Sequence, residues 1–212
     1  MIDTLFFQLE KLEKVQGSRF RVQPVESAIG ITTSGRIQQG KGSEGNEPYA
    51  LVTLHRPSNV DDSKVLIIIM ETLQSVAEKL TVVFPVHPRT RQHLQDLQFS
   101  SLNSKLHLID PVGYIEFLAL QKNAKVVITD SGGIQEEATF LDIPCLTLRE
   151  NTERPITVWE GTNKLVRIDE LEYEVEEILK GNGKKGKVPD LWDGKAAGRI
   201  VEVLERLFSV GV

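Results

Sequence analysis

The sequence predicts an α/β protein built around a doubly wound parallel sheet, and three observations support that prediction. Six short apolar runs rich in β-branched residues follow one another from residue 49 onward, and segments with helical periodicity separate them. The runs are continuously apolar, which is typical of strands buried on both faces by crossover helices. The chain has 212 residues, 40% of them hydrophobic, which is enough to bury a sizeable core. Right-handed crossovers then place helices on both sides of the sheet.

The expected elements are as follows, in chain order. A helix over residues 1–15 opens the chain, because apolar residues at spacings of three, four and three form one face: Ile2, Leu5, Leu9 and Leu12. Residues 27–48 shift to Gly, Ser, Thr, Gln and Glu and predict a flexible loop. Strands are expected over residues 49–55, 81–87, 105–110, 124–129, 144–148 and 163–168. Helices are expected over residues 63–80, 89–97, 114–122, 133–141, 170–180 and 195–208.

Composition excludes several function classes. Lys and Arg number 25 and Asp and Glu 30, so the net charge is −5, which argues against binding nucleic acid through bulk charge. A local basic pocket for one small anion stays open. The single cysteine, Cys145, cannot form an intrachain disulfide or a multi-cysteine metal site. The longest apolar run, residues 65–70, is far shorter than a membrane helix, and the N-terminus shows no signal peptide, so we expect a cytoplasmic protein without a membrane partner.

The carboxyl ends of the strands are where ligands bind in this architecture, and the segment over residues 129–137 is the sharpest candidate there. It reads Thr-Asp-Ser-Gly-Gly-Ile-Gln-Glu-Glu, so a buried strand ends, two glycines follow and a helix begins. Gly132 and Gly133 let a phosphate approach the backbone at the helix N-terminus, and Ser131 offers a hydroxyl. Either of the two closing glutamates is placed to accept hydrogen bonds from a ribose diol. A plain strand-to-helix turn is the alternative, and a metal site built on those glutamates would lack further ligands.

Two histidines also end strands. His55, with Arg56 beside it, ends the first strand, and histidine is the side chain most often used as a general acid or base. From its position alone, a hydrogen-bonded structural histidine is the favoured interpretation. His87 ends the second strand and faces the same crevice.

Other candidates depend on their neighbours in sequence. Arg149 and Arg154 follow the fifth strand, and their guanidinium groups match phosphate geometry, although a solvated loop with internal salt bridges fits equally well. Phe117 offers a ring for stacking on a base, but at helical spacing a phenylalanine is more often part of the core.

Six segments, in this order and spacing, resemble the non-hydrolysing UDP-N-acetylglucosamine 2-epimerases. They are Thr53-Leu-His-Arg, Pro85-Val-His-Pro-Arg, Tyr114-Ile-Glu-Phe, Thr129-Asp-Ser-Gly-Gly-Ile-Gln-Glu-Glu-Ala, Leu148-Arg-Glu-Asn-Thr-Glu-Arg-Pro and Glu160-Gly-Thr-Asn-Lys-Leu-Val. The resemblance extends from the first helix to about Val166. Each motif alone is weak, but six in register make a specific pattern.

The resemblance implies a Rossmann-like fold that forms the C-terminal half of a two-domain enzyme of the GT-B type. Residues 1–26 would be the interdomain helix and its lead-in, residues 27–48 a flexible loop, and residues 49–212 the UDP-binding domain. The family's N-terminal half, with its Gly-Thr-Arg-Pro-Glu motif and acidic catalytic residues, has no counterpart in these 212 residues. We therefore expect an excised piece or a gene truncated at an internal Met, from an enzyme that is a homodimer when complete.

The resemblance also implies a reaction and roles for residues. The family interconverts UDP-N-acetylglucosamine and UDP-N-acetylmannosamine by elimination of UDP and its re-addition, with no nicotinamide, other cofactor or metal. By this resemblance His55 is a catalytic or substrate-positioning residue, and Arg56 and His87 match positions tied to an allosteric substrate site. The expected UDP and substrate contacts are Ser131, Gly132 and Gly133 at the diphosphate, Glu137 at the ribose, Arg154 at phosphate or sugar, and Phe117 at the uracil.

One departure concerns the segment after His55. The family usually reads His-Arg-Arg-Glu-Asn where this chain has Pro57 and Ser58 in place of the second Arg and the Glu. The histidine stays in place, but the allosteric contacts lose two side chains. Two other functions remain open at this point: a nucleotide-sugar binding module without catalysis, and the hydrolysing relative that releases free N-acetylmannosamine.

Overall fold

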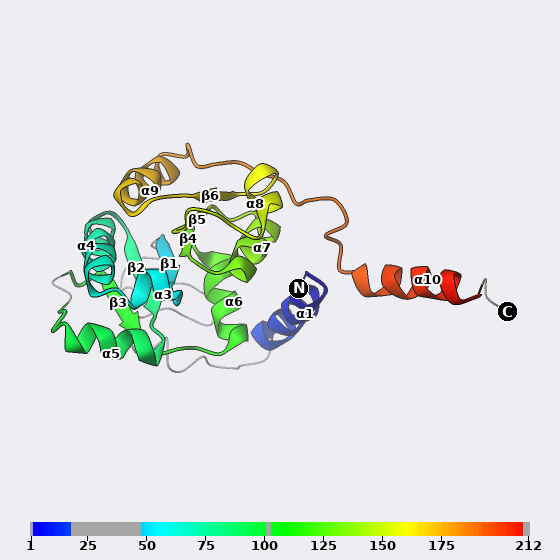
Figure 1. Ribbon diagram of the computed structural model, residues 1–212, viewed down its shortest axis with the longest axis horizontal. Coiled ribbons are helices and arrows are strands. Elements are labelled where there is room, and N and C mark those ends of the chain that lie inside the picture. Colours follow the sequence, from blue (N-terminus) through cyan, green and yellow to red (C-terminus); the bar gives the residue numbers. More distant parts are fainter. Residues whose placement is uncertain (1, 18–47, 101–102, 210–212) are drawn as a thin grey trace.

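A six-stranded parallel sheet forms the centre of the computed structural model, which describes residues 2–17, 48–100 and 103–209 (Figure 1). The strand order is β3-β2-β1-β4-β5-β6, which is the doubly wound order. The strands are β1 (Tyr49–Thr53), β2 (Thr81–Pro85), β3 (Leu106–Ile109), β4 (Val126–Thr129), β5 (Cys145–Thr147) and β6 (Asn163–Leu165). All neighbouring pairs are parallel. The predicted fold class is confirmed, and the order reverses between β1 and β4.

Helices precede, connect and follow the strands, and those between strands cover both faces of the sheet (Figure 1). They are α1 (Ile2–Gly17), α3 (Pro57–Val60), α4 (Ser63–Lys79), α5 (Pro88–Asp96), α6 (Tyr114–Asn123), α7 (Gly132–Phe140), α8 (Pro155–Trp159), α9 (Leu171–Leu179), α10 (Ala196–Ser209) and the 3-10 helix η1 (Ile168–Glu170). The expected helices are confirmed within one or two residues. The short helices α3 and α8 were not expected; each begins with a proline, whose fixed φ suits the first helical position.

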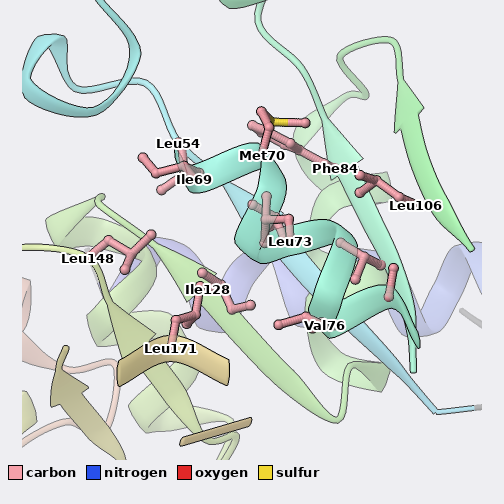
Figure 2. Packing of buried hydrophobic residues seen from close by; sticks show 14 of the residues in the cluster. Leu54, Ile69, Met70, Leu73, Val76, Phe84, Leu106, Ile128, Leu148 and Leu171 are labelled. Carbon is pink, nitrogen blue, oxygen red and sulfur yellow. The ribbon is translucent and has the colours of Figure 1, made fainter. Parts of the chain in front are cut away.

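Residues of β1 alternate between two hydrophobic clusters. Ala50 and Val52 belong to the larger cluster, which α4 and α9 cover, and Tyr49 and Leu51 face the other side, where α6 packs. Figure 2 shows Met70 of α4 beside Phe84 of β2, and Leu171 of α9 beside Ile128 of β4. Both faces are therefore buried, as the continuous apolar runs predicted.

The first helix has the predicted apolar face. Leu5 and Leu12 are fully buried against Leu118 of α6, and Ile2 and Leu9 pack around them. The role of this helix as a link between two domains stays a prediction. The predicted flexible loop over residues 27–48 lies outside the described residues, except for its last residue.

The last helix, α10, extends away from the sheet (Figure 1). Its exposed large apolar residues are Ile200, Val201, Val203, Leu204, Leu207 and Phe208. None of the helices in the described ranges is long and apolar enough to cross a bilayer.

Candidate functional site

The carboxyl ends of β1 and β4 lie side by side at the point where the strand order reverses, because Thr53 pairs with Thr129. The chain leaves β1 through His55 and leaves β4 through Asp130, so the fold brings these two residues together. Ligands bind in this kind of crevice in open α/β sheets. We therefore treat the surroundings of these two strand ends as the candidate site.

Asp130 is the centre of the site, and its side chain is fully buried. Its Oδ2 accepts hydrogen bonds from the backbone N–H groups of His55 at 3.0 Å and Arg56 at 2.9 Å, and from the Asn59 side chain at 3.1 Å. Its Oδ1 lies 3.1 Å from Nδ1 of His55, whose side chain is 53% exposed. A buried carboxylate is costly unless donors compensate its charge, and these contacts provide that compensation.

The helix α7 begins beside this cluster. Ser131 is its N-cap residue, and Gly132 and Gly133 form its first turn, as the sequence predicted. The Ser131 hydroxyl makes no capping hydrogen bond, while its backbone N–H donates to Oγ1 of Thr129 at 3.0 Å. The first N–H groups of a helix have no partner within the helix, and the dipole there favours an anion. This end of α7 therefore has the chemistry of a phosphate site.

Glu153 and Arg154 lie against Gly132, and Glu153 in turn pairs with Arg56 and Arg149. The Glu153 carboxylate accepts hydrogen bonds from Arg56 at 2.9 Å and from Arg149 at 2.5 Å, and a Cβ placed on Gly132 would come within 2.8 Å of it. The backbone N–H of Glu153 and then these arginines lower the pKa of Glu153, so it is ionised. Arg154 also borders Gly132, with its Cγ 3.6 Å from the same Cβ position.

Glu137 lies one turn further along α7 and is buried. The Tyr114 hydroxyl donates to its Oε1 at 2.7 Å. Burial raises the pKa of Glu137, the hydrogen bond from Tyr114 lowers it, and the charge of Glu136 raises it. Burial and the same carboxylate raise the pKa of Tyr114. Arg154 Nε lies 3.5 Å from Oε2 of Glu136, so the two glutamates have different neighbours.

Two predicted site residues have other contacts in the structure. Phe117 is partly buried and packs against the apolar cluster beneath α6, in agreement with the core alternative. His87 is exposed and caps α5, where its Nδ1 accepts a hydrogen bond from the backbone N–H of Arg89 at 3.3 Å. The structure thus gathers His55, Arg56 and Arg154 with the start of α7, while Phe117 stands one turn after Tyr114 on α6 and His87 follows the carboxyl end of β2.

Sequence reasoning gave no role to Asp130, Tyr114 or Glu153. Asp130 follows a buried strand and precedes two glycines, and this is a usable signal for a residue in the crevice. Tyr114 and Glu153 belong to the quoted motifs, but Glu137 lies 23 residues from Tyr114 and Arg56 lies 97 residues from Glu153, so no local pattern reveals these two contacts. The pair of Glu153 with Arg149, four residues before it, is the internal salt bridge that the loop alternative predicted.

A separate cavity of about 490 Å³ lies at the amino ends of the strands, opposite the crevice. The residues that line it include Lys125, Pro144 and Thr162, which come just before β4, β5 and β6. It is therefore not part of the crevice. Within the described part of the chain, no group of three or more His, Cys, Asp or Glu side chains is arranged to hold a metal ion.

Comparison with known proteins shows the family. Residues 22–205 match the family described as UDP-N-acetylglucosamine 2-epimerase. The UDP-N-acetylglucosamine 2-epimerase of Methanocaldococcus jannaschii is 44% identical over 166 residues, which cover 75% of this chain and 45% of that protein. That of Methanococcus maripaludis is 42% identical over 159 residues, 68% of this chain and 43% of that protein. The chain thus spans about half the length of the curated relatives it matches.

Solved structures agree with the observed fold. A crystal structure of the Methanocaldococcus jannaschii enzyme in complex with UDP-GlcNAc and UDP has a TM-score of 0.74 at 34% identity, covering 97% of this chain and 52% of that one. The Neisseria meningitidis enzyme bound to UDP-GlcNAc has a TM-score of 0.71 at 32% identity, covering 97% of this chain and 53% of that one. With its all-parallel sheet matching half of these GT-B-like structures, the chain belongs to the UDP-N-acetylglucosamine 2-epimerase family.

Proposed function

We propose that this chain is the UDP-binding, C-terminal half of a non-hydrolysing UDP-N-acetylglucosamine 2-epimerase, and that it is inactive alone. The observation that carries the proposal is the start of α7, where a glycine turn opens a helix beside Arg154 and beside Glu153, whose carboxylate pairs with Arg56 and Arg149. Backbone N–H groups, a helix dipole and arginines together suit a diphosphate. The relatives solved with UDP or UDP-GlcNAc support the nucleotide assignment.

In this proposal Ser131, Gly132 and Gly133 hold the diphosphate, and Arg154 contacts phosphate or sugar. Glu137 binds the ribose, and its burial beside Tyr114 supports a fixed position for that carboxylate. Phe117 is only partly buried, and the exposed part of its ring lines the uracil pocket. None of these residues changes its covalent state during the reaction, so they act by binding UDP in the ground and transition states alike.

The proposed reaction removes the proton from C2 of the sugar and breaks the bond between C1 and the UDP oxygen, so that UDP leaves with the electron pair. Re-addition of UDP and protonation on the other face of C2 give UDP-N-acetylmannosamine. His55 is the proposed acid–base or positioning residue on this half, and the other half supplies the remaining groups. An allosteric role for Arg56 and His87, a homodimeric complete enzyme and a cytoplasmic location remain predictions.

Isothermal titration calorimetry of the 212-residue chain with UDP tests the proposal. We expect binding in the millimolar range or tighter, since the diphosphate site is already formed by backbone groups but lacks the closure that a second domain supplies. Arg154→Ala should weaken binding by ~10-fold, about 1.4 kcal/mol. Arg206→Ala, which removes the same charge from exposed α10, is the matched control and should bind as the unmodified chain does. No detectable binding at millimolar UDP would contradict the assignment.

A further inference from the structure

The buried carboxylate of Asp130 contacts the one residue of this half that is proposed to exchange a proton. Its Oδ1 lies 3.1 Å from Nδ1 of His55, and the Asp130 side chain is fully buried while that of His55 is half exposed. One ring nitrogen therefore faces the buried carboxylate, while within the described residues no hydrogen bond holds the other, Nε2. This arrangement gives the two ring nitrogens different chemistry.

The hydrogen bonds around Asp130 assign one oxygen to the backbone and the other to the ring. Oδ2 accepts from His55 N, Arg56 N and Asn59 Nδ2, all within 3.1 Å. Oδ1 accepts a longer hydrogen bond, of 3.2 Å, from the same His55 backbone N–H, and the ring nitrogen Nδ1 lies beside it. Oδ1 is thus the acceptor available to Nδ1.

We infer that Asp130 is a positioning residue, which holds His55 in the tautomer with its proton on Nδ1. A carboxylate accepts but does not donate, so the neutral imidazole must present Nδ1–H to it and keep the lone pair on Nε2. Any proton that His55 exchanges with substrate then passes through Nε2. When Nε2 takes a proton, the imidazolium charge lies beside the carboxylate, which stabilises it while Asp130 stays ionised.

The role of Asp130 in proton transfer rests on the proposed function, whereas the tautomer of His55 can be measured without it. A purely structural role is the alternative, because the same carboxylate ties the backbone of residues 55 and 56 to β4. Asn59 separates the two roles. It donates to Asp130 Oδ2 and to the Leu148 carbonyl oxygen, so Asn59→Ala loosens the same loop without touching the ring contact.

Nitrogen-15 NMR of the histidine rings in the 212-residue chain tests the inference, recorded well above the ordinary histidine pKa of about 6.5 so that the imidazole is neutral. Loss of one set of signals in His55→Gln assigns the resonance. We expect the Nδ1–H tautomer in the unmodified chain and in Asn59→Ala, and a shift toward the Nε2–H tautomer in Asp130→Asn. If the unmodified chain has the Nε2–H tautomer, the inference is wrong. This measurement does not depend on whether any variant folds. An unchanged tautomer in a folded Asp130→Asn chain also overturns it.

Kinetics of a complete enzyme, made by joining this chain to the N-terminal half of a relative, add the functional consequence. Asp130→Asn should lower kcat by ~10²-fold or more and change KM little, as expected when a general acid or base loses its orientation. UDP titration of the chain reports on the proposed function separately. An Nδ1–H tautomer without UDP binding would leave the positioning role supported and refute the nucleotide assignment. UDP binding with the Nε2–H tautomer would do the reverse.

Discussion

Gly132→Ala tests whether the start of α7 must admit a ligand. A Cβ at this position would lie 2.8 Å from Oε1 of Glu153, which is 0.6 Å inside the ordinary contact limit of 3.4 Å. Because this oxygen is the end of a flexible side chain, Glu153 moves aside and the fold is retained. Alanine also favours a helix over glycine, by up to about 1 kcal/mol. The chain should therefore be as stable as before or slightly more stable.

UDP binding should suffer instead, because the methyl group occupies the space through which a phosphate reaches the backbone. Loss of one hydrogen bond to a charged group costs roughly 1.5–3 kcal/mol, or ~10- to 100-fold in Kd. Calorimetry measures the Kd, and urea unfolding measures the stability.

Two other glycines calibrate the result. Gly198→Ala on α10 meets nothing within 4 Å, so it should leave Kd unchanged and stabilise the helix. Gly161→Ala would approach the Thr157 carbonyl oxygen at 2.6 Å, and should destabilise the fold because backbone must shift. A Gly132→Ala chain with normal Kd would show that the diphosphate does not approach the backbone there.

Three further outcomes are expected. Leu73→Ala, which opens a cavity beneath α4 in the larger cluster, should lower the free energy of unfolding by about 2–5 kcal/mol in urea titrations, and a loss under about 1 kcal/mol would contradict the packing. The pKa of Glu137 is raised in the folded state, so the folded chain loses stability as pH rises from the unfolded to the folded pKa of this carboxyl. The Tm of the unmodified chain should therefore fall relative to that of Glu137→Gln as pH rises through this range. A Tm difference that stays constant with pH would refute this. The isolated chain should be inactive, so UDP-N-acetylmannosamine detected by NMR in its reaction mixture would overturn the need for a second half.

The sequence predicted the order of strands and helices correctly but extended three strands too far, among them the sixth, which was expected over residues 163–168 and ends at Leu165. The first two expected strands included His55 and His87, whereas β1 ends at Thr53 and β2 at Pro85. Both histidines leave the sheet to meet partners that periodicity does not reveal: the buried Asp130 carboxylate for one, and the start of α5 for the other. Hydrophobic patterning reports which residues are buried, not where the hydrogen-bond ladder stops.

Parts of the site were predictable because glycines at the start of a helix and arginines after the end of a strand indicate a phosphate site without knowledge of distant contacts. Gly132 and Arg154 were placed at a phosphate site, and the structure brings them together. Sequence patterns did not identify the contacts of Asp130 with His55 and of Glu153 with Arg56, because each joins groups more than 70 residues apart in the chain. The segment after the fifth strand was considered as a loop, and the short helix α8, which begins at Pro155, was not expected there.

The pairing of β1 with β4 has a consequence for how the protein is made. Thr129 follows Thr53 by 76 residues, so β1 leaves the ribosome long before its central partner does. At ~5–20 residues per second this delay is about 4–15 s, during which one edge of an apolar strand is unpaired. During this time the unpaired edge of β1 can pair with strands of other nascent chains. The crevice, which needs Asp130 beside His55, cannot exist until translation has passed β4, so nucleotide cannot assist the earliest steps of folding.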